Sequence, residues 1–202
     1  TYGNGIFTGN TNDAIVFNSS SDYVYIDNSV DVNFGNGTND VPFSIAASID
    51  INSNTTNLPF IWKRNGTSGG LEQSYFSLIN SGIIIFRLVD QSTGGLMDIR
   101  TTTVLSTNTP YQVLLTYDGS SLNSGLNIYI NGVLQSVTRS TSGTYIAMEE
   151  FNHELIVGRW GKTNTFNFDG EMEDLAIFKT ELSGSDALSL YNTVSTGGSV
   201  PI

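Results

Sequence analysis

Hydrophobic and polar residues alternate in short runs along the chain, and clusters of Gly, Asn and Ser separate these runs. In residues 43–51, FSIAASIDI, every second residue from Phe43 to Ile51 is hydrophobic, and serines and Asp50 fill most positions between them. A period of two is typical of a β-strand with one buried face. Residues 111–118, YQVLLTYD, repeat the pattern. We therefore expect a strand in each of these segments.

The same pattern predicts further strands and the turns that join some of them. Asn131-Gly132 lies between two hydrophobic runs, and both of its residues tolerate the positive φ that a type I′ hairpin turn requires. Ser81-Gly82 predicts a second tight hairpin. The remaining strands are expected in residues 14–17, 22–27, 58–66, 75–80, 83–89, 96–100, 126–138, 154–160 and 171–178.

One helix is expected, in residues 182–192, LSGSDALSLYN. Ser183 and Asp186 have the spacing of a capping box, and Leu182, Leu188 and Tyr191 are predicted to face the sheet. Many short strands, Gly-rich turns and a single helix favour one all-β domain, an antiparallel two-sheet β-sandwich, over residues 1–192. Residues 193–202 are expected to form a tail or linker.

Composition narrows the classes of partner. The chain has 202 residues with 8 Lys and Arg against 19 Asp and Glu, which gives a net charge of −11. This acidic balance argues against nucleic acid and anionic lipid as partners. The absence of cysteine excludes disulfides and thiol chemistry. No hydrophobic run is long enough to predict membrane insertion. No signal peptide is visible, and because the chain begins at Thr1 we expect a mature or excised piece.

Several motifs in order resemble one known family. They are Tyr117-Asp118-Gly119, Asn131-Gly132, Val157-Gly158-Arg159 and the closing segment FDGEMEDLAIF, residues 168–178, and the opening residues 14–27 fit as well. Together these motifs resemble the laminin-G-like branch of the concanavalin A-like jelly rolls over about residues 12–192. The resemblance implies a jelly-roll sandwich whose last strand lies beside its first.

The resemblance also implies a calcium ion as the one cofactor to consider. In such domains an acid of the closing strand often helps to hold a structural or ligand-bridging calcium. Here that position is Glu173, whereas the family usually has Asp, and this difference argues against a bound ion. If the chain ends pair as the family's do, the candidate ligands that converge would be Asp22, Asp40, Glu173 and Asp174. The alternative is that these acids are ordinary solvated or hydrogen-bonded side chains.

The acids of the closing segment raise the question of catalysis. Glu171 and Glu173 share one face of a regular strand, at a separation near that of a retaining glycosidase's carboxyl pair. A third acid is missing from the residues that follow, however, and these are Leu175, Ala176 and Ile177. His153 is the only histidine, so neither a catalytic triad nor a zinc site is indicated. We therefore expect the chain not to be an enzyme.

Two tryptophan regions are candidates for ligand binding. Sugar sites combine an aromatic ring with nearby hydrogen-bonding side chains. Trp160 lies where a strand gives way to a long connection, so ligand binding and core packing are equally open for it. Trp62 precedes a Gly-rich loop, and core packing is the favoured interpretation for it. The candidate set is Arg159, Trp160, Lys162, Asn164 and Asn167, together with Trp62, Arg64 and Asn65.

These observations favour a non-catalytic recognition or adhesion module that binds a glycan or a protein through loops of the sandwich. The alternative is a structural role in assembly, as a virion decoration or cell-surface appendage domain, in which an oligomer or particle would form. Either role predicts a location outside the cell, on a cell surface or on a virion.

Overall fold

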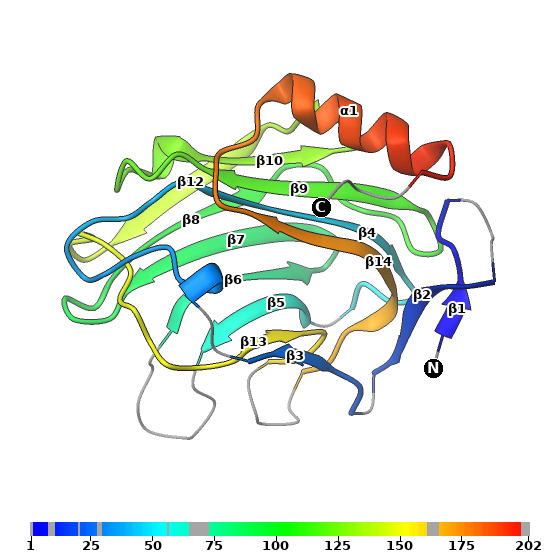
Figure 1. Ribbon diagram of the computed structural model, residues 1–202, viewed down its shortest axis with the longest axis horizontal. Coiled ribbons are helices and arrows are strands. Elements are labelled where there is room, and N and C mark those ends of the chain that lie inside the picture. The colour runs from blue at the N-terminus through cyan, green and yellow to red at the C-terminus, as the bar shows by residue number, and fades with distance from the viewer. Residues whose placement is uncertain are drawn as a thin grey trace.

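The structure, a computed structural model, describes residues 2–7, 11–19, 21–27, 30–55, 57–64, 73–160 and 166–198. Within these residues the chain forms two seven-stranded antiparallel sheets that pack face to face, with one α-helix over the outer side of one sheet (Figure 1). The predicted all-β jelly-roll sandwich with one short helix near the C-terminus is confirmed.

The first sheet, sheet A, has the strand order β1-β2-β14-β4-β9-β10-β11. Its strands are β1 Tyr2–Asn4, β2 Thr11–Asn18, β14 Asp169–Phe178, β4 Phe43–Ile51, β9 Tyr111–Tyr117, β10 Leu126–Ile130 and β11 Val133–Leu134. The closing strand β14 lies between β2 and β4, and its Met172 pairs with Ile15 on one side and Ile49 on the other. The prediction that the last strand returns beside the opening strands is therefore confirmed.

The second sheet, sheet B, has the strand order β12-β8-β7-β6-β5-β13-β3. Its strands are β12 Val137–Ser142, β8 Gly95–Thr101, β7 Ile83–Asp90, β6 Gln73–Asn80, β5 Asn57–Arg64, β13 Leu155–Val157 and β3 Val24–Ile26. Two short 3₁₀ helices, η1 Val30–Val32 and η2 Asn123–Gly125, lie in connections between strands. Sheet B thus ends at the three-residue strand β3, which lies at the lower edge of the molecule in Figure 1.

Both predicted hairpin turns are present. Asn131 and Gly132, between β10 and β11, have φ values of 51° and 75°. Ser81 and Gly82, between β6 and β7, have φ values of 51° and 79°. Positive φ at both central residues gives a turn whose twist matches that of the flanking strands.

Helix α1, Gly184–Ser195, begins at the predicted capping box, in which the Ser183 side chain accepts from the backbone N–H of Asp186. The helix continues three residues past its predicted end at Asn192. Its buried residues are Ala187, Leu190 and Val194, which pack on Ala46, Leu114 and Tyr129 of sheet A. The expectation that Leu188 faces the sheet is wrong, because this side chain is 49% exposed.

The helix changes the environment of β4. Its alternate residues Phe43 to Ile51 face the core as predicted, but Ser44, Ala46 and Ser48 on the opposite face are also fully buried. The expectation of one buried face is therefore wrong for this strand. Small side chains there allow a close approach, and Ser44 donates to the carbonyl of Thr180 and accepts from the N–H of Leu182 just before the helix.

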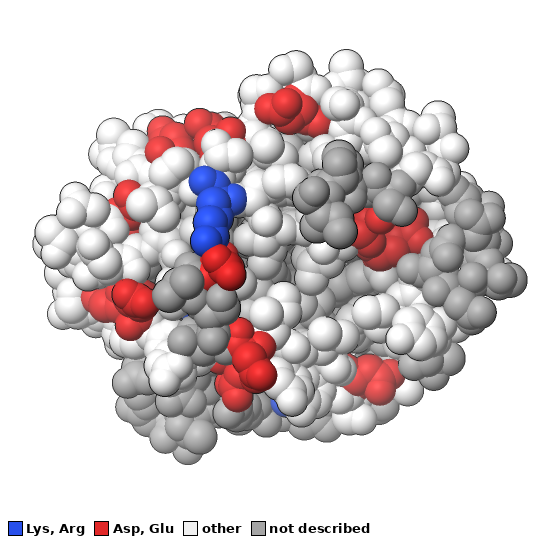
Figure 2. Space-filling model, viewed as in Figure 1, with Lys and Arg blue, Asp and Glu red and all other residues white. Residues whose placement is uncertain are grey.

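The surface is acidic overall, as the composition predicts. The face shown in Figure 2 carries separate acidic patches and little basic surface. Lys179, after β14, forms an exposed ion pair with Asp31 of η1. An exposed pair of this kind contributes little to stability, so packing supplies most of it.

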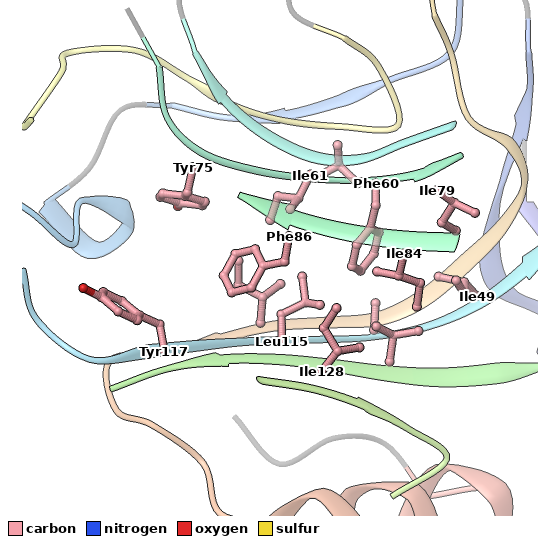
Figure 3. Packing of buried hydrophobic residues seen from close by; sticks show 14 of the residues in the cluster. Ile49, Phe60, Ile61, Tyr75, Ile79, Ile84, Phe86, Leu115, Tyr117 and Ile128 are labelled. Carbon is pink, nitrogen blue, oxygen red and sulfur yellow. The ribbon is translucent and has the colours of Figure 1, made fainter. Parts of the chain in front are cut away.

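The main core lies between the two sheets (Figure 3). Residues from β4, β9 and β10 of sheet A face residues from β5, β6 and β7 of sheet B, and the labelled side chains of the figure interdigitate in the space between. At one end of this space Phe43 stacks on Phe34 with ring centroids 4.2 Å apart and contacts Tyr75 at 5.1 Å. Close-packed rings make this end of the sandwich rigid.

Strand β14 is not regular, contrary to expectation. Glu173 pairs with Ser48 and Ala176 pairs with Ala46, so β14 has one extra residue at this point and forms a β-bulge. Asp174 occupies the bulge with a φ of 53°. The bulge reverses the alternation: Met172 faces the core before it, and Leu175 and Ile177 face the core after it.

Candidate functional site

Two exposed tyrosines mark the free edge of sheet B. Tyr23 and Tyr25 are two residues apart in extended chain, so they lie on one face of the sheet. Tyr23 is 42% exposed and Tyr25 is 54% exposed. Their ring centroids are 6.3 Å apart and the rings are tilted by 31°. Two neighbouring exposed rings form a contiguous apolar surface, and contiguous apolar surface is where proteins contact ligands and partners.

Arg159 lies over one of these rings. Its guanidinium carbon is 3.5 Å from the centroid of the Tyr23 ring, which is a close cation–π contact. The backbone of Arg159 is held by a bridge to Asn167, and the N–H of Trp160 donates to the carbonyl of Phe166. These bonds fix the direction of the arginine, which follows directly after β13 and Gly158.

A hollow of about 530 Å³ lies at these residues and is lined by Tyr23, Tyr25, Glu154, Ile156 and Arg159. We name it the tyrosine hollow. Its volume falls within the roughly 300–1,000 Å³ that ligand sites occupy. Its lining combines two aromatic rings, one aliphatic side chain, one cation and one anion, so it offers both stacking surface and polar contacts.

The floor of the tyrosine hollow rests on a row of buried side chains. Ile156 pairs with Tyr25 on one side and with Trp62 on the other. Trp62 is fully buried, and its ring stacks on Phe76 at 4.1 Å and contacts Trp160 at 4.5 Å. Tight aromatic packing beneath a hollow keeps its shape fixed in the absence of a ligand.

The segment that carries Glu154 is anchored from inside the sandwich. Lys63 of β5 is 1% exposed, and its ammonium group donates to the carbonyl of His153. Burial lowers the pKa of Lys63 to about 8, although Glu154 and Glu150 act in the opposite direction. The two glutamates thus favour the charged form of Lys63, whereas burial disfavours that charged form.

The structure brings together part of the predicted binding set. Arg159 lines the tyrosine hollow, and Trp160 and Asn167 lie beside it. Trp62 lies beneath the hollow, and because its indole is fully buried it packs in the protein interior and offers no exposed surface to a ligand. Lys162, Asn164 and Asn65 lie outside the described residues, and of Arg64 only the backbone is described. Sequence reasoning missed Tyr23, Tyr25 and Glu154.

The four predicted calcium ligands have different partners in the structure. Asp40 accepts from the hydroxyls of Tyr117 and Tyr145 and from the N–H of Met148. Burial raises the pKa of Asp40, against the effect of these hydrogen bonds and with a further contribution from Asp90. The described residues contain no group of three or more acidic, histidine or cysteine side chains that could hold a metal ion. Calcium binding stays a prediction.

The other three calcium candidates are engaged at separate places. Asp22 accepts from the N–H of Asn18, and Glu173 accepts from the N–H of Ile6. Asp174 occupies the β-bulge of β14. Glu173 therefore attaches the N-terminal segment to the closing strand.

One pair of acids was not anticipated. Glu171 of β14 lies directly opposite Asp50 of β4 on the outer face of sheet A. Burial raises the pKa of Asp50, and a backbone hydrogen bond from Thr109 acts against this. Two carboxyl groups opposite each other on neighbouring strands can approach to within about 5 Å, so a hydrolase needs its own test.

Comparison with known proteins agrees with the two-sheet jelly-roll architecture. The profile of the laminin G family Laminin_G_3, described as the concanavalin A-like lectin/glucanases superfamily, matches residues 18–187. The chain therefore belongs to this family, and the resemblance found in the sequence is confirmed. A search of curated proteins finds no match.

Solved structures with the same fold include botulinum neurotoxin binding domains. The serotype G binding domain is 20% identical with a TM-score of 0.62, and the match covers 95% of this chain and 45% of that one. The receptor-binding domain of mosaic serotype C/D is 18% identical with a TM-score of 0.65, over 90% and 42% of the two chains. The chain thus spans less than half the length of these structures. At this identity the likeness concerns the fold alone.

The described residues contain no helix that is both long and apolar enough to cross a membrane.

Proposed function

We propose that this chain is a non-catalytic recognition module that binds a glycan in the tyrosine hollow. The observation that carries the proposal is the exposed ring of Tyr25 beside Arg159 and Glu154 on a rigid sheet edge. The C–H face of a sugar packs on an aromatic ring, and its hydroxyls pair with charged side chains that donate and accept hydrogen bonds. A preformed hollow lowers the entropic cost of binding.

Tyr25 is the main stacking ring in this proposal. The guanidinium of Arg159 covers one face of Tyr23, which leaves less of that ring for a sugar. Tyr25 is the more exposed of the two, and its strand is held by pairing with Ile156. Arg159 and Glu154 form the polar wall of the hollow.

The comparisons support a binding role in general terms. The family description includes lectins, and the similar solved structures are titled as receptor-binding or binding domains. A module that recognises glycans would act outside the cell or on a surface, which is the location we propose.

A glycan array, run with calcium and with a chelator, tests the proposal. The wild-type chain is expected to give saturable binding, and Tyr25→Ala is expected to weaken it about tenfold, since loss of a stacking contact costs about 1–1.5 kcal/mol. Arg159→Gln should also weaken binding. Leu188→Ala, an exposed residue on α1, is the matched control and should bind as the wild type does. Binding that survives both site variants unchanged would contradict the proposal.

The alternatives give different results in the same set of measurements. An assembly protein would give no array signal and would form a defined oligomer in light scattering. A hydrolase would release reducing ends from a panel of β-glucans and would lose this activity in Glu171→Gln and Asp50→Asn, because these acids face each other across β14 and β4.

A further inference from the structure

A second hollow adjoins the first at the edge of the sandwich. It has a volume of about 260 Å³, and its lining includes Tyr2, Ile15, Phe17, Asp22, Tyr23 and Val24. We name it the edge hollow. Tyr23 lines both hollows, so they meet at this one residue.

The edge hollow exists because the two sheets end at different strands. On this side sheet A ends at β1, which pairs with β2, and sheet B ends at β3. A short connection after Asn18 carries the chain from one sheet to the other. In Figure 1 the lower end of β2 approaches β3 across this connection. Side chains at this edge stay open: Tyr2 is 69% exposed, Ile15 is 37% exposed and Val24 is 36% exposed.

Size argues for an extension and against an independent site. A hollow of about 260 Å³ is smaller than the roughly 300–1,000 Å³ of typical ligand sites. Joined to the tyrosine hollow, it lengthens a site that is already within this range. A ligand that occupies both must be elongated and must cross Tyr23.

Charge narrows the class of that ligand. The tyrosine hollow contains Arg159 and Glu154, whose charges are opposite. The described lining of the edge hollow contains Asp22 and no basic residue. A sugar carboxylate or sulfate in the edge hollow would therefore meet an acid without a cation to balance it, in a chain of net charge −11.

We propose that the two hollows are adjoining subsites for one neutral oligosaccharide, with the tyrosine hollow as the primary subsite and the edge hollow as its extension. This inference rests on the proposed function. Tyr25 contributes to binding of short and long chains alike. Tyr2 and Ile15 contribute only when the chain is long enough to pass Tyr23.

The experiment uses calorimetry to measure how the affinity for an oligosaccharide depends on the number of its sugars. The probes are cello-, manno- and chito-oligosaccharides of two to six sugars, with oligogalacturonates of the same lengths as the charged counterpart. The wild-type chain is expected to bind at least one neutral series, with affinity that rises about tenfold from the shortest to the longest member. The double variant Tyr2→Ala/Ile15→Ala should keep the affinity for short members and lose the rise. Leu188→Ala should behave as the wild type does.

The outcomes separate the two proposals. If Tyr25→Ala weakens binding but affinity is independent of length, or if the double variant weakens the shortest probes, the two-subsite inference is wrong and the proposed function stands. Tighter binding of the oligogalacturonates than of every neutral series would overturn the assignment to neutral chains. If Tyr25→Ala changes no affinity, or if no series binds, both proposals fail.

Discussion

Asp40 is the acceptor at the centre of a partly buried hydrogen-bond network, and its replacement tests how that network stabilises the fold. Its Oδ2 accepts from the hydroxyl of Tyr117 at 2.8 Å and from that of Tyr145 at 2.7 Å. Its Oδ1 accepts from the N–H of Met148 at 2.8 Å. The three donors come from β9 and from the segment that precedes β13, so one carboxylate joins elements of both sheets. Asp40→Ala leaves all three donors without this partner.

The loss in free energy of unfolding that we expect for Asp40→Ala follows from the number and kind of donors that lose their acceptor. A buried donor that loses its partner costs about 1–3 kcal/mol. The N–H of Met148 cannot turn away, whereas the two hydroxyls can rotate toward other acceptors and should cost about 1 kcal/mol each. Burial raises the pKa of Asp40, so removing the charge recovers part of the loss. We expect Asp40→Ala to lower the free energy of unfolding by about 3 kcal/mol.

Asp40→Asn is the matched control. Asparagine keeps the size of the side chain and one oxygen acceptor for Met148, its amide can donate to a tyrosine oxygen, and it carries no charge to desolvate. We expect this variant to lose about 1 kcal/mol or less. The difference between the two variants therefore measures the hydrogen bonds and not the carboxylate charge.

The assay is urea unfolding at neutral pH, followed by tryptophan fluorescence and run once with calcium and once with chelator. Calcium is expected to leave the order of the free energies of unfolding of the wild type, Asp40→Asn and Asp40→Ala unchanged, because the oxygens of Asp40 already accept from protein donors. An alanine variant within 1 kcal/mol of the wild type, or an asparagine variant as unstable as the alanine one, would refute the reasoning. Calcium that stabilises the wild type but not Asp40→Asn would show Asp40 to be a metal ligand.

Two further predictions concern single positions. Burial acts to raise the pKa of Asp90, but hydrogen bonds from Thr93, Ile146 and Ser92 outweigh it and lower the pKa from 3.8 to about 2. Asp90 therefore contributes stability above pH 3.8, and this contribution is lost as the pH falls toward 2. Asp90→Asn should remove about 2 kcal/mol of this pH dependence when unfolding is measured from pH 2 to pH 6. Gly170 has a φ of 149°, and a Cβ there would lie 2.1 Å from the carbonyl oxygen of Asp50, so Gly170→Ala should cost about 3 kcal/mol or more in urea unfolding. A Cβ at Gly94 would meet no atom within 4 Å beyond its chain neighbours, so Gly94→Ala should cost about 1 kcal/mol. A flat stability profile for wild-type protein below pH 4, or equal losses in the two glycine variants, would contradict these expectations.

The alternation of hydrophobic residues was sufficient to predict the strands that face the core, because a period of two is a local property. The alternate residues of β4 from Phe43 to Ile51 face the core, as predicted. What covers the opposite face could not be predicted from the local sequence, since Ser44, Ala46 and Ser48 resemble a solvated face. Ala46 is buried in a cluster with residues of α1, and Ser44 hydrogen-bonds the segment just before the helix. The β-bulge was also not predicted, because nothing in the local sequence distinguishes Asp174 from a regular strand residue.

The candidate site was predicted in part for a similar reason. The aromatic and basic residues near Trp160 pointed to the sheet edge where the tyrosine hollow lies, and Arg159 lines this hollow. Tyr23 and Tyr25 were interpreted only as part of a strand, although their alternate spacing already places both on one face. That this face is open depends on β3 being the last strand of sheet B, which is a property of the topology.

The order of residues across sheet B explains how an edge strand of three residues can present a rigid site. Tyr25, Ile156, Trp62, Phe76, Arg87 and Asp98 are successive cross-strand neighbours. Ile156, Trp62, Phe76 and Asp98 are buried, and the half-buried Arg87 forms an ion pair with Asp98 at 2.7 Å. Ile156, Trp62 and Phe76 pack together in one cluster, and the pairing of β3 with β13 holds the backbone of Tyr25 beside it. An edge strand that is held in this way can leave its tyrosines exposed on a preformed surface, which lowers the entropic cost of binding an uncharged but polar ligand such as an oligosaccharide.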